Sequence, residues 1–227
     1  MDLVKNTLAE QIYQILRNDI LTLRIPLGEK LTLKAMQERF GVSSTPIRDA
    51  LTRLTDDGLV NYYSNIGVNV INLTTEDLTE LYQFMGELDS LALTYCESWP
   101  NQQEVLAAFE KLLKETEALE QLLHTFPDNP EYSRRWISCS DEFHLIFYNY
   151  CQNSRLTRAA EKQRSQLTIF SNMYEADPDV QKLIAKWHRS IYDSYKSGHI
   201  EDAARKMKAH LEESLTYALK FLNYKLS

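Results

Sequence analysis

Three short helical segments, each ended by Pro or Gly, occupy the first 58 residues. These helix-breaking residues keep each helix short and so limit the folds that the chain can adopt. The first segment runs from Leu8 to about Leu23, and Pro26 and Gly28 then break the pattern. Its inward side is expected to hold the apolar residues that recur at helical spacing, namely Leu8, Ile12, Ile15, Leu16 and Ile20. Because short helices are stable only when packed, the segments indicate one small helical domain.

The second and third segments are joined by a tight turn. Thr32 is placed to cap the second segment, and Gly41 ends it. Ser44 or Thr45 is placed to cap the third, with Pro46 in its first turn, where a missing N–H costs nothing. The expected inward residues are Met36 and Phe40 in the second segment, and Ile47, Ala50, Leu51 and Leu54 in the third, which Gly58 closes.

A stretch of alternating polar and apolar residues, LVNYYSNIGVNVINL, follows over residues 59–73. This alternation predicts a β-hairpin that turns around residues 64–67. Three helices followed by a hairpin describe a winged helix-turn-helix domain, which we assign to residues 1–73.

The remainder, residues 74–227, shows helical periodicity and no strand pattern. Thr74, followed by Glu76 and Asp77, is placed to start a long helix. Six helices are expected between clusters of Pro, Gly, Asn and Asp, over residues 75–98, 101–124, 130–152, 154–174, 177–197 and 200–224. The predicted fold class is therefore mainly α: an amino-terminal winged helix-turn-helix followed by an all-α antiparallel helical bundle.

Charge, cysteine content and hydropathy narrow the possible functions. The net charge is −7, but residues 1–76 carry eight basic and nine acidic residues, so 8 − 9 = −1 falls there and −6 falls beyond. This argues against a general polyanion binder but is compatible with a local DNA site. The charged start of the chain and the lack of a long apolar run predict no secretion signal and no membrane span. Three cysteines without a CxxC pair predict reduced thiols in a cytoplasmic protein.

The outer face of the third segment is suited to reading DNA. It carries Thr45, Arg48, Asp49, Thr52 and Arg53. In a helix-turn-helix, the recognition helix enters the major groove amino end first, so hydroxyls and free N–H groups meet phosphates there. Arg48, one turn further, can reach the O6/N7 edge of a guanine, while Lys34 and the hairpin tip contact the flanking backbone. A solvated surface helix is the alternative, but the order of the surrounding elements favours DNA.

The same residues resemble the GntR family of bacterial transcription regulators. GVSSTPIRDALTRLTDDGLV (41–60) resembles the family signature S-x-T-P-[VI]-R-[ED]-A-L-x-R-L-x-x-x-G-L, and LAEQIYQILRNDILTLRIPLGEKL resembles its first helix and P-G-x-x-L turn. The resemblance implies DNA contacts by Lys34, Ser43, Ser44, Thr45, Arg48 and Gly67, and Thr52 on the outer face completes the predicted set. The family usually has arginine where Ser44 and Ile66 stand, so we expect fewer phosphate contacts here.

Three histidines fall near the middles of three different predicted helices: His144, His188 and His210. Imidazoles that face inward from a bundle can hold a first-row transition metal, and Asp141 shares the face of His144. Histidines that only pack or face solvent are the alternative interpretation.

Resemblance to a family adds to this hypothesis. DEFHLIFYNYCQNSRL and HRSIYDSYKSGHIEDAARKMKAHL resemble the FCD-type effector domain of the FadR subfamily. The resemblance implies a divalent transition metal, zinc or nickel, held by Asp141, His144, His188 and His210. The usual family aspartate lies four residues before the first histidine, where this chain has Ser140, and the family often has a glutamate where Asp89 stands. An open coordination position suits a small carboxylate effector, to which Arg158 and Arg164 could bond if they do not simply face solvent.

The sequence therefore predicts a ligand-responsive transcription regulator, not an enzyme. It would bind double-stranded, pseudo-palindromic operator DNA as a homodimer, with effector binding and dimerisation in residues 74–227. One alternative is a metal-dependent hydrolase built on the bundle, which needs a general base near the metal, whereas Glu142 is expected to face elsewhere. The other is an adaptor whose winged helix binds protein.

Overall fold

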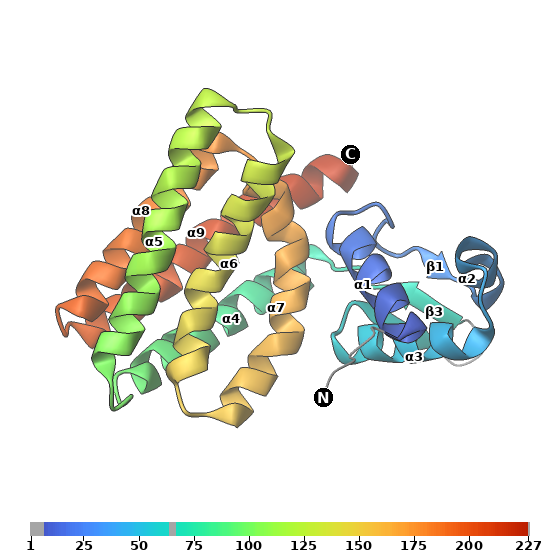
Figure 1. Ribbon diagram of the computed structural model, residues 1–227, viewed down its shortest axis with the longest axis horizontal. Coiled ribbons are helices and arrows are strands. Elements are labelled where there is room, and N and C mark those ends of the chain that lie inside the picture. Colours follow the sequence, from blue (N-terminus) through green and yellow to red (C-terminus); the bar gives the residue numbers. More distant parts are fainter. Residues whose placement is uncertain (1–6, 64–66, 227) are drawn as a thin grey trace. The chain divides into compact units, whose positions relative to one another are not determined.

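The structure is a computed structural model that describes residues 7–63 and 67–226 (Figure 1). The chain divides into two compact units. The first is built from the chain up to Thr74 together with residues 161–169, and the second from residues 75–160 and 170–227. The expected fold class is confirmed: helices and a small sheet form the first unit, and helices form the described part of the second.

Up to Thr74, the described part of the first unit contains three helices and a three-stranded antiparallel sheet with strand order β1-β3-β2. The three helices all precede β2 in the sequence. The elements are α1 (Leu8–Leu21), β1 (Lys30–Leu31), α2 (Leu33–Phe40), α3 (Ser44–Asp56), β2 (Val60–Tyr63) and β3 (Gly67–Val70). The hairpin is confirmed, with Tyr62 paired to Val68, although its turn at 64–66, including Ile66, lies outside the described residues. The short strand β1, which pairs Lys30 with Asn69, was not expected because two residues are too few to show alternation.

The core of this unit lies between α1 and α3. The predicted stripe of α3 is buried in full: Ile47, Ala50, Leu51 and Leu54. The prediction for α1 was partly wrong, because Leu8 is 55% exposed and Ile15 is 43% exposed. Leu8 lies in the first turn, and Ile15 is rotated by about 100° from its buried neighbour Leu16. Tyr13 is buried instead.

The helix starts in this unit differ in one respect from the expectation. Thr32 caps α2, since its hydroxyl accepts a hydrogen bond from Ala35 N at 3.2 Å. The cap residue of α3 is Ser43 and not Ser44 or Thr45, because Ser43 is extended (φ −68°, ψ 168°) and helical conformation starts at the next residue. The Ser43 side chain makes no capping hydrogen bond, so its hydroxyl is not used to cap α3.

Gly41 closes α2 in the left-handed conformation, with φ at 67°. A Cβ built there would meet no atom within 4 Å, so any cost of a side chain is conformational. We expect Gly41→Ala to lower the free energy of unfolding by about 1 kcal/mol, and Gly41→Asn to lower it less because asparagine tolerates this conformation. Urea unfolding of both variants measures the difference, and equal losses for alanine and asparagine would contradict this explanation.

The second unit contains the six expected helices, whose ends differ from the predicted ones by at most two residues. They are α4 (Thr75–Cys96), α5 (Gln102–Thr125), α6 (Pro130–Tyr150), α7 (Ser154–Tyr174), which also supplies residues 161–169 to the first unit, α8 (Pro178–Lys196) and α9 (Ile200–Leu226). Asn129, Asn153 and Asp177 cap α6, α7 and α8 with their side chains, as polar residues at these turns favour. None of the described helices combines the length and the apolar character needed to cross a bilayer.

In the second unit α4 and α8 both pack on α9, and α5 packs on α6 (Figure 1). A cluster of aromatic rings joins α5, α6 and α8, with centroids of Phe109 and Phe147 4.8 Å apart and those of Phe109 and Tyr192 5.7 Å apart. Trp136, also on α6, is fully buried. This core packs together α6 and α8, two of the three helices that carry the histidines.

Candidate functional site

The outer face of α3 presents the side chains predicted to read DNA. Thr45, Arg48 and Thr52 are exposed, and Thr52 donates its hydroxyl to the Arg48 carbonyl at 2.9 Å. On α2, Lys34 is exposed as well. Neither Arg48 nor Lys34 forms an ion pair with any residue that the structure describes, so both charges are available to a ligand.

A groove of about 730 Å³ runs between α3 and the sheet of the first unit. Arg48 and Thr52 line it from the helix, and Gly67 lines it from the start of β3. The structure therefore brings together contacts that the sequence predicted on separate elements. The predicted residues Lys34, Ser43, Ser44 and Thr45 do not line this groove and lie on α2 and at the start of α3.

Two further residues of the groove were missed by the sequence analysis. Lys30, on β1, lines the groove, and a Cβ built at Gly67 would lie 3.7 Å from its Cε. Tyr62, on β2, also lines it and is 68% exposed. Tyr62 could have been found from the alternation of the hairpin, whereas Lys30 depends on the unexpected pairing of β1.

Arg53, by contrast, is held against α1. Its guanidinium pairs with Glu10 and lies 3.9 Å from the centroid of the Tyr13 ring. Burial, and then the hydrogen bond that the hydroxyl donates to Asp57 at 2.5 Å, raise the pKa of Tyr13 to about 12. Tyr13 therefore stays a hydrogen-bond donor at neutral pH. The contacts of Arg53 with Glu10 and Tyr13 hold α3 against α1.

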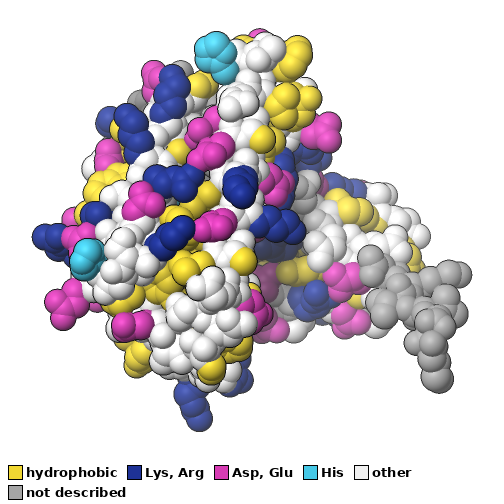
Figure 2. Space-filling view, turned by 60° about the vertical axis from the view of Figure 1, so that its left-hand side comes forward, with side chains coloured by type: hydrophobic (Ala, Val, Ile, Leu, Met, Phe, Trp, Pro, Cys, Tyr) yellow, Lys and Arg dark blue, Asp and Glu magenta, His cyan; other side chains and the backbone are white. Residues whose placement is uncertain are grey.

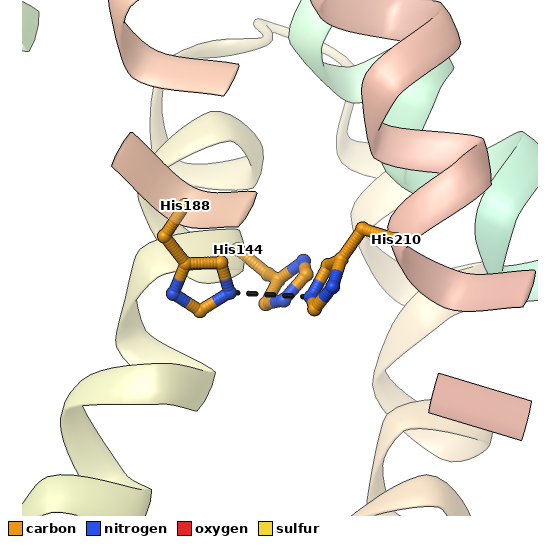
Figure 3. Close-up of side chains that lie close together, drawn as sticks. All are labelled: His144, His188 and His210. Carbon is orange, nitrogen blue, oxygen red and sulfur yellow. Dashed lines mark hydrogen bonds between the residues drawn. The ribbon is translucent and has the colours of Figure 1, made fainter. Parts of the chain in front are cut away.

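The second unit brings the three predicted histidines together (Figure 3). His144 comes from α6, His188 from α8 and His210 from α9, and all three are buried. One nitrogen from each lies within 4.8 Å of the other two. Nε2 of His188 and Nε2 of His210 are 3.3 Å apart.

This arrangement has the chemistry of a metal site. Neutral imidazole nitrogens are good ligands for zinc, nickel and other first-row metals, and three such ligands leave coordination positions open. The ring of Phe143 stacks on His188, with centroids 4.0 Å apart and 9° between the planes, and so fixes the orientation of that imidazole. The residues present therefore fit a divalent transition metal.

The carboxylate beside the cluster differs from the expected one. Asp141 is not in the group of converging donor atoms and is half-buried on α6. Instead Oδ2 of Asp89, on α4, lies 2.8 Å from Nδ1 of His144, although the two are not aligned as a regular hydrogen bond. Tyr148 donates its hydroxyl to Oδ1 of Asp89 at 2.6 Å. In the sequence, Asp89 was noted only as the place where the family often has a glutamate. Its contact with His144 could not be predicted, because α4 and α6 are far apart in the sequence.

A cavity of about 620 Å³ reaches the cluster at His188 and is otherwise lined by residues of α5, α8 and α9. Basic and acidic side chains intermingle on the side of this unit that carries α5 and α8 (Figure 2). Arg189 pairs with Glu117 there, whereas Lys186 forms no ion pair with any described residue.

The two arginines predicted to bind the effector do not line this cavity. Arg158 is exposed and donates Nε to the Ser154 carbonyl of its own helix at 3.2 Å. Arg164 is buried. Their role therefore stays a prediction. Glu142, as expected, is directed elsewhere, since it accepts a hydrogen bond from Arg135 at 2.6 Å.

Comparison with known proteins agrees with both halves of the structure. The profile described as "Bacterial regulatory proteins, gntR family" matches residues 8–70, and the profile of the FCD domain matches residues 80–213. The chain belongs to the GntR family of bacterial regulators and carries an FCD domain, as the FadR subfamily does. It is a ligand-responsive, DNA-binding transcription regulator, and the hydrolase alternative finds no support.

Individual relatives are distant but extend over most of the chain. An uncharacterized HTH-type transcriptional regulator YdhC of Bacillus subtilis is 26% identical over 88% of this chain and 86% of its own length. A probable D-xylose utilization operon transcriptional repressor of Paenarthrobacter nicotinovorans is 24% identical over 92% and 88%. The solved structure of E. coli McbR/YncC matches 97% of this chain and 99% of its own with a TM-score of 0.70 and 20% identity, which shows the shared fold.

Proposed function

We propose that this regulator binds a pseudo-palindromic operator as a homodimer and that a small carboxylate, bound beside a divalent metal, changes its affinity for DNA. Residues 1–73 would bind DNA, and residues 74–227 would bind the effector and form the dimer. The observation that carries the effector part is the convergence of three buried imidazoles in the FCD domain. A protein that binds DNA in this way would act in the cytoplasm.

The proposed DNA contacts lie on both sides of the groove in the first unit and on the neighbouring ends of α2 and α3. Arg48 and Thr52 would face base edges, and Gly67 would let the β2–β3 hairpin approach the DNA backbone. Lys34 and the hydroxyls of Ser43, Ser44 and Thr45 would position the helix on phosphates. A dimer is required because a single winged helix makes too few contacts to select one site in a genome.

His144, His188 and His210 would hold zinc or nickel in the second unit. The ion, when bound, supplies a Lewis-acid centre for the oxygen atoms of a ligand. The cavity at His188 gives such a ligand a place, and Lys186 supports the choice of a carboxylate because its charge has no partner among the described residues.

Regulation would then be a coupling between two sites in one chain. Such couplings are typically about 1–3 kcal/mol, which changes DNA affinity by roughly 5- to 150-fold. The effector would bind one unit and the operator the other, and effector binding would change the spacing of the two DNA-binding domains of a dimer.

Selection of duplexes from a random pool by the purified protein tests this proposal. We expect enrichment of two inverted half-sites whose centres lie about one helical turn, or a multiple of it, apart. Sedimentation of the complex with the best selected duplex should give two chains per duplex. Enrichment of no sequence, or one chain per duplex, would show that the proposal is wrong.

A further inference from the structure

We infer that Asp89 is the positioning carboxylate of the histidine cluster: it fixes the tautomer of His144, and Tyr148 in turn fixes Asp89. This inference rests on the proposed metal site and assigns a role to two residues of α4 and α6 that bind no metal themselves. It also explains how this chain has a carboxylate at the site although Ser140 occupies the usual position of one.

Asp89 needs partners because of where it lies. Its side chain is 1% exposed, and a buried carboxylate is costly unless its oxygens are paired. Each of its two oxygens has a neighbour: Tyr148 donates to Oδ1 at 2.6 Å, and Nδ1 of His144 is 2.8 Å from Oδ2. The carboxylate thus bridges a phenol and an imidazole inside the bundle.

The short contact decides which nitrogen of His144 carries the proton. Two acceptors 2.8 Å apart would repel, so the imidazole nitrogen facing Asp89 must be the protonated one. A neutral imidazole with a proton on Nδ1 keeps its lone pair on Nε2. Only a nitrogen with a free lone pair can bind a metal, and Asp89 therefore selects Nε2 of His144 as the ligand atom.

One ring nitrogen of His144 lies within 4.8 Å of a ring nitrogen of each of the other two histidines. Their Nε2 atoms face each other at 3.3 Å, and the three rings point toward one another (Figure 3). In metal sites generally, a ligating histidine donates its second N–H to a carboxylate or carbonyl, which fixes the ring and raises the basicity of the ligand. Asp89 lies at the corresponding place, with Oδ2 2.8 Å from Nδ1 of His144, and we infer that a small rotation of the ring when metal binds aligns the two as donor and acceptor.

The origin of the carboxylate distinguishes this chain from the family pattern. Ser140 lies one turn before His144 on α6 and is buried, but a hydroxyl brings no negative charge. Asp89 brings that charge from α4, on the Nδ1 side of His144. It offsets part of the charge of an ion while leaving the open coordination positions to the effector.

The test measures zinc affinity of the full chain by competition with a chelating dye, with each variant checked for folding by circular dichroism. Asp89→Asn removes the charge at constant size and is expected to weaken zinc binding by about 10- to 100-fold. Asp89→Glu, which keeps a carboxylate, should recover most of that loss. Tyr148→Phe, which removes the hydroxyl donor, should give a smaller fall in the same direction. Glu142→Gln is the matched control, since Glu142 bonds to Arg135, and it should leave affinity unchanged.

A purely structural role for Asp89 predicts another result: lower stability of the metal-free protein with zinc affinity within twofold of the parent chain. That result, in a folded Asp89→Asn variant, would overturn the inference. If that variant does not fold, Tyr148→Phe decides, and unchanged affinity there overturns it. Absence of zinc binding by the parent chain would instead show that the proposed metal site is wrong.

Discussion

Replacing His188 and His210 together with alanine is expected to abolish stoichiometric metal binding. The change removes two of the three converging imidazoles and leaves one ligand, which cannot hold a divalent ion against water. In the parent chain, metal binding is expected to stabilise the folded state by about 4 kcal/mol when free metal is a thousandfold above its dissociation constant. The double variant should show none of this gain.

Urea unfolding with and without added zinc measures the effect, and metal analysis of tag-free protein purified without chelator gives the stoichiometry. His124→Ala with His199→Ala is the matched control, because both side chains are exposed and lie outside the cluster. The control should keep the full metal-dependent gain. A parent chain that is metal-free and whose stability ignores both zinc and nickel would rule out a functional metal site.

The elements of this fold were predictable because local rules determine them. The stripe of Ile47, Ala50, Leu51 and Leu54 follows from helical period alone, and all four are buried. Thr32 caps α2 because its hydroxyl can reach a free N–H three residues on. The six long helices were found because Pro, Gly, Asn and Asp mark the turns between them.

The features that the sequence did not predict depend on contacts between residues that are far apart in the chain or on backbone angles. Ile15 has the spacing of a core residue, but its side chain is 43% exposed, so its side of α1 is not packed into the core. β1 forms only because β3 offers it a partner. The sequence offered Ser44 or Thr45 as the cap of α3, but the cap is Ser43, whose backbone is extended. All three residues have a hydroxyl that can cap a helix, so side-chain chemistry does not choose among them.

The candidate site shows the same division. The three histidines could be chosen because each lies near the middle of a predicted helix, and they converge in the structure. The carboxylate could not be chosen, since Asp141 is close to His144 in sequence and Asp89 is close in space. Contact between α4 and α6 comes from packing, and no local pattern encodes it.

Arg48→Ala is expected to reduce affinity for the best selected duplex by about 1–3 kcal/mol and to relax base preference at one position of each half-site. The reason is geometric: Arg48 is exposed on α3, lines the groove toward the wing and has no ion-pair partner among the described residues. A guanidinium can bond to both O6 and N7 of a guanine, and alanine leaves those acceptors unpaired. Titration of duplexes that differ only at the affected base pair measures both quantities.

Lys34→Ala provides the contrast that separates base reading from attraction to phosphate. It should weaken binding about equally for all duplexes and lower the slope of log affinity against log salt by about 1. Arg53→Ala, which frees Glu10 and uncovers Tyr13, should lower stability and leave base preference intact. If Arg48→Ala instead weakened every duplex equally, as Lys34→Ala should, α3 would bind the DNA backbone, and sequence would have to be read from another element of the groove.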